Sequence, residues 1–234
     1  MQIKFASYNI HKAVGLDRRR DHERILRILR EIDADVVALQ EVDRRFGRRM
    51  AVIPLDAIHA ATDYVPVPMS LKPDSLGWHG NALLVRKGID LVEAAPVPLP
   101  VLEPRGAVRA DLDAGGFRFR VIGMHLDLSG LRRRHQIRSV LEHVADCNHN
   151  CPTVLMGDLN EWSQHGGCLD ELDDGWRVLK PGRSFPSRRP LAHLDRIIIS
   201  DHWAVLGTNV HHSPLSAIGS DHLPVFASLH VPKN

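Results

Sequence analysis

The stretch Thr153-Val154-Leu155-Met156-Gly157-Asp158-Leu159-Asn160 joins an apolar run to two polar side chains on alternate positions. The apolar, partly β-branched run 153–156 predicts an interior strand, which Gly157 ends. Because side chains alternate between the faces of a strand, Asp158 and Asn160 are expected to point the same way. An acid and an amide held together at a sheet edge can bind hydrated Mg²⁺ or orient a water nucleophile, although a plain turn also uses these residues.

The pattern of an apolar run with a polar end recurs along the chain. Five further strand-like segments carry Asn9, Glu41, His125, Asp195 and the pair Asp221-His222. Strands of one sheet whose polar ends lie on one side build a site in the crevice at that edge. The repetition therefore favours a functional site over a set of unrelated turns.

Apolar periodicity outlines the other elements of an α/β protein. Asp21 is a plausible N-cap for a helix over 22–32, and the strand that carries Glu41 follows it, so strand, helix and strand alternate. A second helix begins near Pro54, and an amphipathic helix covers 131–144. We also expect a hairpin of 107–112 with 117–126 around Gly115-Gly116, and a paired strand unit of 81–85 with 91–92. The four prolines of 96–104 predict a loop or an edge crossing, and 180–190 is expected to be an exposed loop.

The composition is that of an ordinary globular protein, with 234 residues, 44% hydrophobic and 25% charged. A chain of this length can bury roughly 70–75% of the surface that it exposes when unfolded. Because the polar strand ends run along the whole chain, we expect one domain over 1–234. The net charge of +2 is smaller than a dedicated duplex-DNA binder would need.

Three cysteines, an odd and small number, favour free thiols in a reducing compartment. Cys147, His149 and Cys151 lie close together in sequence, but no second half-site for zinc follows them. No signal peptide and no transmembrane stretch is evident, so the cytoplasm is the simplest location.

Taken in order, the polar strand ends resemble the motifs of a known family. Asn9, Gln40-Glu41, His125, Gly157-Asp158-Leu159-Asn160, Leu194-Asp195 and Ser220-Asp221-His222 resemble the endonuclease/exonuclease/phosphatase superfamily, which includes deoxyribonuclease I, abasic-site endonucleases, neutral sphingomyelinases and inositol polyphosphate 5-phosphatases. The resemblance spans Asn9 to His222 and is greatest to short bacterial members that consist of the catalytic domain alone. It implies a four-layer α/β/β/α sandwich, with two mixed sheets packed face to face and helices outside.

The resemblance also implies roles for the matched residues. Glu41, Asn9 and Asp221 would hold Mg²⁺ (or Mn²⁺). Asp195 would hydrogen-bond His222, which would then donate to a phosphate oxygen. An imidazole is useful in this way only when a partner fixes its tautomer and charge.

The centre of the implied site is Asp158, as the base that activates water. Asn160 would orient the water or the phosphate, and His125 would donate to a phosphate oxygen. A base of this kind works best with a raised pKa, which we expect burial near Glu41 to supply. Asn81, in a Gly-Asn-Ala motif, and Arg105 are substrate-binding candidates, although Asn81 also suits a supporting role and Arg105 a surface position.

The function that follows is a divalent-metal-dependent phosphoesterase acting as a hydrolase on phosphodiester (or phosphomonoester) bonds. Modest charge and few aromatics favour a phospholipid head group or a small phosphodiester, with Trp78, Trp162 and Trp203 as candidates to line its pocket. The alternative is a DNA repair endonuclease or exonuclease; a non-catalytic binding module on the same scaffold is the third reading. The expected partner is a phosphate-ester substrate, with nucleic acid and peripheral membrane contact left open, and the expected state is a monomer.

Overall fold

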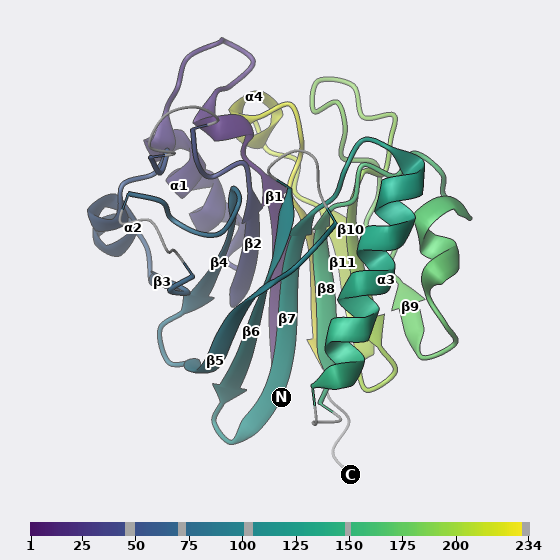
Figure 1. Cartoon of the computed structure of the whole chain (residues 1–234). Coiled ribbons are helices and arrows are strands. Elements are labelled where there is room, and N and C mark those ends of the chain that lie inside the picture. The colour runs from purple at the N-terminus through teal and green to yellow at the C-terminus, as the bar shows by residue number, and fades with distance from the viewer. Residues whose placement is uncertain (45–49, 70–73, 101–104, 148–150, 231–234) are drawn as a thin grey trace.

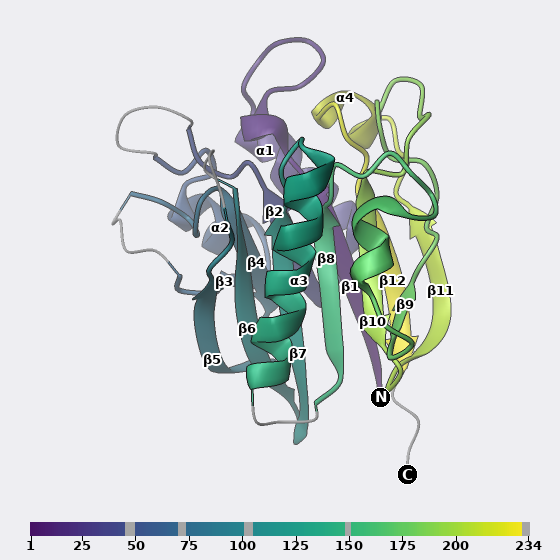
Figure 2. The ribbon, with the colours of Figure 1, turned by 45° about the vertical axis from the view of Figure 1, so that its right-hand side comes forward.

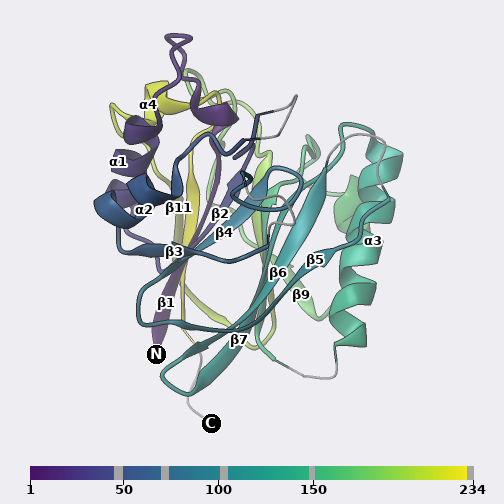
Figure 3. The same ribbon diagram turned by 60° about the vertical axis from the view of Figure 1, so that its left-hand side comes forward.

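Two six-stranded mixed sheets pack face to face, with helices outside them, in the computed structural model of the chain (Figure 1). The structure describes residues 1–44, 50–69, 74–100, 105–147 and 151–230. Figure 3 shows α1 (His22–Ile32) and α2 (Leu55–Ala61) on one side of the sandwich and α3 (Gly130–Asp146) on the other. This is the α/β/β/α sandwich expected from the sequence. None of the described helices has the length and apolar character needed to cross a membrane.

The first sheet has the strand order β11-β12-β1-β2-β4-β3. Its strands are β1 (Gln2–Asn9), β2 (Val36–Gln40), β3 (Tyr64–Pro66), β4 (Asn81–Arg86), β11 (Ala204–Val210) and β12 (Val225–His230). β1 and β2 are parallel and are joined through α1, whereas the other pairs of the sheet are antiparallel. The side chain of Asp21 caps α1 by accepting a hydrogen bond from the Arg24 backbone N–H at 2.9 Å, as its sequence predicts.

The second sheet has the strand order β5-β6-β7-β8-β10-β9. Its strands are β5 (Asp90–Val97), β6 (Gly106–Ala114), β7 (Phe117–His125), β8 (Thr153–Asp158), β9 (Trp176–Val178) and β10 (Asp195–Ser200). β7 and β8 are parallel and are joined through α3, which covers the outer face of this sheet (Figure 2). The predicted hairpin is present as β6 and β7, and both glycines of its turn have positive φ. Short helices η1 (His11–Ala13), η2 (Gly167–Glu171) and α4 (Ser216–Gly219) complete the described elements.

The main core lies between the two sheets. Phe5 of β1, Phe119 of β7 and Trp203 are buried there and meet edge to face, with ring centroids 5.4–6.0 Å apart. Two further apolar clusters lie outside the sheets, under α1 and α2 on one side and under α3 on the other. Trp203 therefore belongs to the core, and the expectation that it lines a substrate pocket is wrong.

Two expectations about local structure are also wrong. β4 and β5 are not a paired unit, because β4 pairs with β2 and β3 in the first sheet while β5 pairs with β6 in the second. The short turn between them carries the chain from one sheet to the other. The segment 180–190 is not simply exposed, since Ser184 and Ser187 are completely buried. Of the proline-rich segment, residues 96–97 end the edge strand β5, and 101–104 lie outside the described residues.

Strand registers bring the polar strand ends to one end of the sandwich. In the first sheet Asn9 lies opposite Gln40, and Gln40 lies opposite Asn81. In the second sheet Asp158 lies opposite both His125 and Asp195. This alignment requires Gly157, because an added Cβ there would lie 1.9 Å from the carbonyl oxygen of Met124.

A candidate active site at one end of the sandwich

Asp158 is the centre of the site and is buried at the end of β8. Its Oδ2 accepts a hydrogen bond from Asn9 Nδ2 at 3.0 Å and lies 3.3 Å from His125 Nε2 and 3.7 Å from His222 Nε2. Its Oδ1 accepts from the Asn160 backbone N–H at 2.9 Å. One carboxylate therefore gathers two imidazoles and an amide that come from both sheets.

Asp195 and His222 form a buried pair beside Asp158. His222 Nδ1 lies 2.9 Å from Asp195 Oδ2, and the Ser184 hydroxyl donates to the same oxygen at 2.5 Å. Burial lowers the pKa of His222, but the charges of Asp195 and Asp158 outweigh it and raise that pKa to about 10. Burial raises the pKa of Asp195. From this raised pKa we expect His222 to be an imidazolium that donates from Nδ1 to Asp195 and presents Nε2 to Asp158.

The pKa of Asp158 differs from the expectation. Burial raises it, but His125, His222 and the Asn9 amide outweigh burial and hold it well below its usual range. The expectation of a raised pKa is wrong because the carboxylate is surrounded by hydrogen-bond donors and positive charge, not by apolar groups. Asp158 is therefore ionised throughout the neutral range.

Glu41 follows β2 and lies half-buried, with φ of 58°. Its Oε2 forms an ion pair with Lys12 Nζ. Lys12 and its neighbours His11 and Ala13 also have positive φ, of 57°, 44° and 57°. Such conformations are costly for residues other than glycine and cluster at functional sites. Burial raises the pKa of Glu41, but the bond from Lys12 and the nearby histidines leave it lowered.

Asn9 and Asp221 lie next to each other through Ser220. The Ser220 hydroxyl is 2.7 Å from the Asn9 carbonyl oxygen and 3.2 Å from Asp221 Oδ1. Asn9 Oδ1 accepts from the His11 backbone N–H at 3.1 Å, and Asp221 Oδ1 lies 3.7 Å from His11 Nδ1. The β1–β2 register places this group beside Glu41.

The donor chemistry of this end of the sandwich fits the hard divalent cation that the family resemblance implies. The carboxylates of Glu41 and Asp221 and the amide oxygen of Asn9 are the oxygen ligands that Mg²⁺ and Mn²⁺ prefer. Asp158, Asp195 and His222 also place potential ligand atoms within 4.8 Å of one another. That second set suits a proton network better, because Asp195 Oδ2 already accepts two hydrogen bonds and His222 carries a proton.

The remaining sequence-predicted residues lie around this centre. Asn160 is buried, and its Nδ2 donates to the Leu126 carbonyl oxygen at 2.9 Å, which braces the end of β7. Arg105 Nη1 contacts His125 Nε2. Asn81 is buried with Nδ2 3.4 Å from the carbonyl oxygens of Trp78 and His79, while its Oδ1 has no partner. This environment agrees with a supporting role for Asn81.

Sequence reasoning missed several residues that contact His222 or support its neighbours. Besides Ser184, the Ser187 hydroxyl donates to the Ser220 carbonyl oxygen at 2.6 Å. The Phe185 ring lies 4.8 Å from the His222 ring, and Trp162, which is 64% exposed, packs edge to face on Phe185 at 6.1 Å. Nothing distinguishes Ser184, Phe185 and Ser187 in a loop of mixed composition, whereas Trp162 was among the aromatic residues named from the sequence. Lys12, which pairs with Glu41, was missed as well.

The cysteines have no part in this centre. All three are free, as expected, and Cys147 Sγ accepts from Arg109 Nη1 at 2.8 Å on the far part of β6. His149, the third member of the zinc alternative, lies outside the described residues.

Comparison with known proteins identifies the fold and the family. The Escherichia coli K12 protein YbhP is 28% identical over 253 aligned residues, which cover 98% of this chain and 96% of YbhP. An endonuclease/exonuclease/phosphatase of Bacteroides vulgatus superposes with a TM-score of 0.79 at 16% identity, covering 99% of this chain and 100% of its own.

Two other solved structures share the fold. D. rerio TDP2 complexed with single strand DNA product has a TM-score of 0.76 at 16% identity, covering 98% of this chain and 99% of its own. A mannosyl-6-phosphatase of Bacteroides thetaiotaomicron has a TM-score of 0.76 at 20% identity, covering 97% and 99%. The family model Endonuclease/Exonuclease/phosphatase matches residues 6–222, nearly the whole length. The chain therefore belongs to the endonuclease/exonuclease/phosphatase family.

Proposed function

We propose that the chain is a divalent-metal-dependent hydrolase of phosphate esters, with phosphodiesters as its first substrate class. The observation that carries this proposal is the buried carboxylate of Asp158 between two imidazoles, His125 and His222, one of which is fixed by Asp195. A structural core has no need of this arrangement, because burying an acid with two imidazoles is costly. Hydrolysis of a phosphate ester would use each of these four side chains.

In this proposal Asp158 positions the attacking water and accepts its proton as the new P–O bond forms. The P–O bond to the leaving alcohol breaks in the same displacement, and the leaving oxygen takes up a proton from solvent. The low pKa of Asp158 keeps its carboxylate ionised. Proton transfer from the water to this carboxylate becomes favourable as the water oxygen acquires positive charge during its attack. His222 donates from Nε2 to a non-bridging phosphate oxygen, and Asp195 keeps its other nitrogen occupied. Arg105 faces the same oxygen cluster and adds positive charge, and the His125 imidazole lies beside it.

Glu41, Asp221 and Asn9 would hold the Mg²⁺ or Mn²⁺ ion. A bound divalent cation supplies charge neutralisation at the phosphate and at the leaving oxygen. Asn160 contributes by fixing the Asp158 loop against β7, and Asn81 by supporting the turn that precedes β4. We also propose that residues 1–234 form one catalytic domain, because the main core is shared by both sheets.

The substrate is best sought among small or single-stranded phosphodiesters. Net charge is only +2, which is little for gripping duplex DNA. The exposed Trp162 beside Phe185 offers an aromatic surface next to the site, suited to an apolar or planar group. The shared fold of TDP2, with its single strand DNA product, and of the mannosyl-6-phosphatase keeps DNA and monoester arms in the test.

The test is a hydrolysis screen with and without Mg²⁺ or Mn²⁺. Its arms are bis-p-nitrophenyl phosphate, p-nitrophenyl phosphate, mannose 6-phosphate, abasic duplex DNA, single-stranded DNA and phospholipid vesicles. We expect metal-dependent turnover of a diester, with Glu41→Gln shifting the metal titration to higher concentration. Undiminished turnover after exhaustive chelation would contradict the metal assignment. Absence of turnover in every arm would favour a non-catalytic binding module.

A further inference from the structure

Arg196 is a buried cation without an acidic partner among the described residues. It follows Asp195 on β10 but, because side chains alternate, it lies on the outer face of the second sheet, as Ile198 does. It is 4% exposed. Its Nη2 donates to the carbonyl oxygens of Ser163 at 2.9 Å and Glu161 at 3.4 Å, whereas its Nε has no partner. Across the described ranges, no carboxylate oxygen lies within ion-pair distance of its guanidinium.

The acids nearest to Arg196 are already committed to other cations. Glu161 pairs with Arg133, whose Nη2 lies 3.2 Å from Glu161 Oε2. Asp195 pairs with His222. Taking a guanidinium out of water without a counter-ion is unfavourable, and burial accordingly lowers the pKa of Arg196. The Arg196 guanidinium therefore has no counter-ion among the described residues, and an anion would neutralise it.

Arg196 lines a cavity of about 340 Å³ on this face. The cavity also includes His165, Lys180 and His193. Its whole lining falls within the described stretch 151–230 and contains the cations Lys180 and Arg196, two histidines and no aspartate or glutamate. His193 Nδ1 donates to the Gly182 carbonyl oxygen at 2.8 Å, and burial lowers the pKa of His193, so its ring forms part of the cavity wall and supplies no positive charge.

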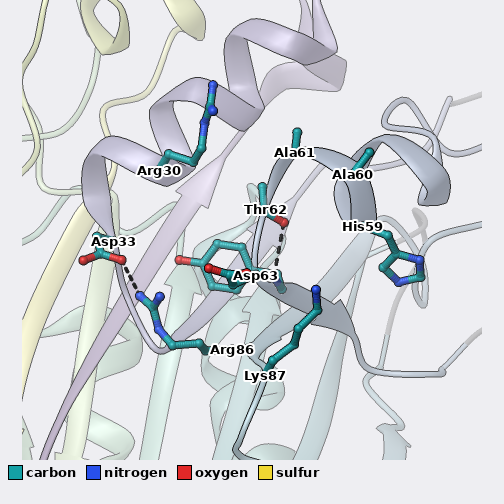
Figure 4. Close-up of a pocket in the computed structure, with 10 residues that line it drawn as sticks. Arg30, Asp33, His59, Ala60, Ala61, Thr62, Asp63, Arg86 and Lys87 are labelled. Atoms are coloured by element: carbon teal, nitrogen blue, oxygen red, sulfur yellow. Dashed lines mark hydrogen bonds and ion pairs between the residues drawn. The ribbon is translucent and has the colours of Figure 1, made fainter.

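A second cavity lies at the end of the first sheet away from the Asp158 centre (Figure 4). It serves as a comparison, because the positive charge of its arginine is balanced by acidic side chains. It measures about 430 Å³ and also contains basic side chains, among them Lys87. Its Arg86, however, pairs with Asp33 at 2.5 Å and with Asp35 at 3.0 Å. The arginine of the larger cavity is thus neutralised within the protein, and that of the smaller one is not.

We propose that the cavity at Arg196 is an anion-binding site for a phosphoryl group or a similar multiply charged oxyanion, separate from the Asp158 centre. Lys180 and His165 would contact the anion from the open side, with Arg196 at the base. The same guanidinium holds the carbonyl oxygens of Glu161 and Ser163, so a bound anion would order the segment that carries Trp162 beside the site. The proposal concerns binding alone and does not depend on the hydrolase assignment.

The experiment titrates metal-free protein with inorganic phosphate at constant ionic strength, by calorimetry and by hydrogen exchange with mass spectrometry. The pocket variant is H165Q/K180Q, which changes only side chains at the open side and leaves buried Arg196 in place. The matched control is K87Q, in the balanced cavity. Phosphate should slow amide exchange in 161–180 of the wild type, and the pocket variant should bind at least about fivefold more weakly, as expected when a charge-assisted contact is lost.

The K87Q protein should bind as the wild type does, and H165Q/K180Q should keep its kcat on a diester within about twofold, because neither residue contacts the Asp158 centre. Equal phosphate affinity and equal protection of 161–180 in the wild type and H165Q/K180Q would overturn the proposal. So would protection confined to peptides that contain Asp158 and His222. Neither result would bear on whether the protein hydrolyses phosphate esters.

Discussion

At the scale of the residue, His222 and Asp195 have the shortest imidazole–carboxylate contact of the site, at 2.9 Å. If Asp195 acts only through His222, removing either should cost most of what removing both costs, because the two act as a unit. We expect D195N and H222A each to lower kcat by roughly 10²-fold or more. The measurement is a double-mutant cycle, with folding checked by circular dichroism. Losses that simply multiply in the double variant would show that the two groups are independent.

The pH dependence of stability tests the charge state of His222. Its pKa is about 10 in the folded protein and about 6.5 in an unfolded chain. A raised folded-state pKa stabilises the protein fully below the unfolded value, and this stabilisation is lost as pH rises towards 10. Between pH 7.5 and 9.5 the free energy of unfolding should fall by up to about 1.4 kcal/mol per pH unit more in the wild type than in H222Q. Parallel urea-unfolding profiles for the two proteins would refute a charged His222.

Lys12 is the residue that we expect to set the metal affinity of the free protein. Its ammonium pairs with Glu41, which is the proposed metal ligand, so cation and lysine compete for one carboxylate. K12M should therefore bind Mn²⁺ about tenfold more tightly or better, since like charges at close range repel strongly in a half-buried site. K12R is the control and should bind as weakly as the wild type. The affinities can be measured by electron paramagnetic resonance of free Mn²⁺. Unchanged or weaker binding by K12M would mean that Lys12 does not occupy the metal position.

The positions of individual site residues were largely predictable, whereas their electrostatics were not. Asn9, Glu41, His125, Asp158 and Asp195 each follow or open an apolar run, and that pattern is visible in the chain. The low pKa of Asp158 depends on imidazoles that come from distant segments. Sequence spacing carries no information about such contacts.

At the scale of the element, the segment that follows β8 is fixed to α3 by a buried ion pair. Glu161 accepts hydrogen bonds from the backbone N–H groups of Ser163 at 3.0 Å and Cys168 at 3.1 Å and pairs with Arg133. Breaking a buried pair leaves an uncompensated charge, so E161Q should lower the free energy of unfolding by roughly 3–5 kcal/mol. Urea unfolding measures this loss.

The same helix offers a matched control for that prediction. Arg134 of α3 pairs with Glu171 at 2.8 Å but is exposed. R134Q should cost at most about 1 kcal/mol, because solvent screens the pair. Similar costs for E161Q and R134Q would show that burial of the Glu161 pair contributes little.

Elements were predictable where one local signal dominates. The cap of α1 and the diglycine turn between β6 and β7 are both specified within a few residues. The sequence analysis wrongly paired β4 with β5 because the tight turn between them is typical of a hairpin. The hairpin is excluded only by the pairing of β4 with β2 in one sheet and of β5 with β6 in the other. Likewise, the buried serines of 180–190 became visible only once their hydrogen bonds to Asp195 and to the Ser220 backbone were known.

At the scale of the whole molecule, the site depends on how the two sheets are stacked. Each sheet contains one parallel pair, β1 with β2 and β7 with β8, and both pairs end at the same end of the sandwich. The shared core, which includes Phe5, Phe119 and Trp203, packs the two sheets against each other. The layered architecture followed from the family resemblance, but the meeting of Asn9 and Asp158 required the register of both sheets.

The central claim is that Asp158 makes this end of the sandwich a hydrolytic centre. The most direct measurement is kcat of D158N against the wild type on the diester that the screen finds turned over fastest, at saturating Mn²⁺. Asparagine keeps the shape of the side chain but cannot accept the proton of water, so kcat should fall by about 10³-fold or more. Mn²⁺ affinity and the circular dichroism spectrum should change little, because Glu41, Asp221 and Asn9 remain. A D158N protein with kcat within tenfold of the wild type would contradict the account.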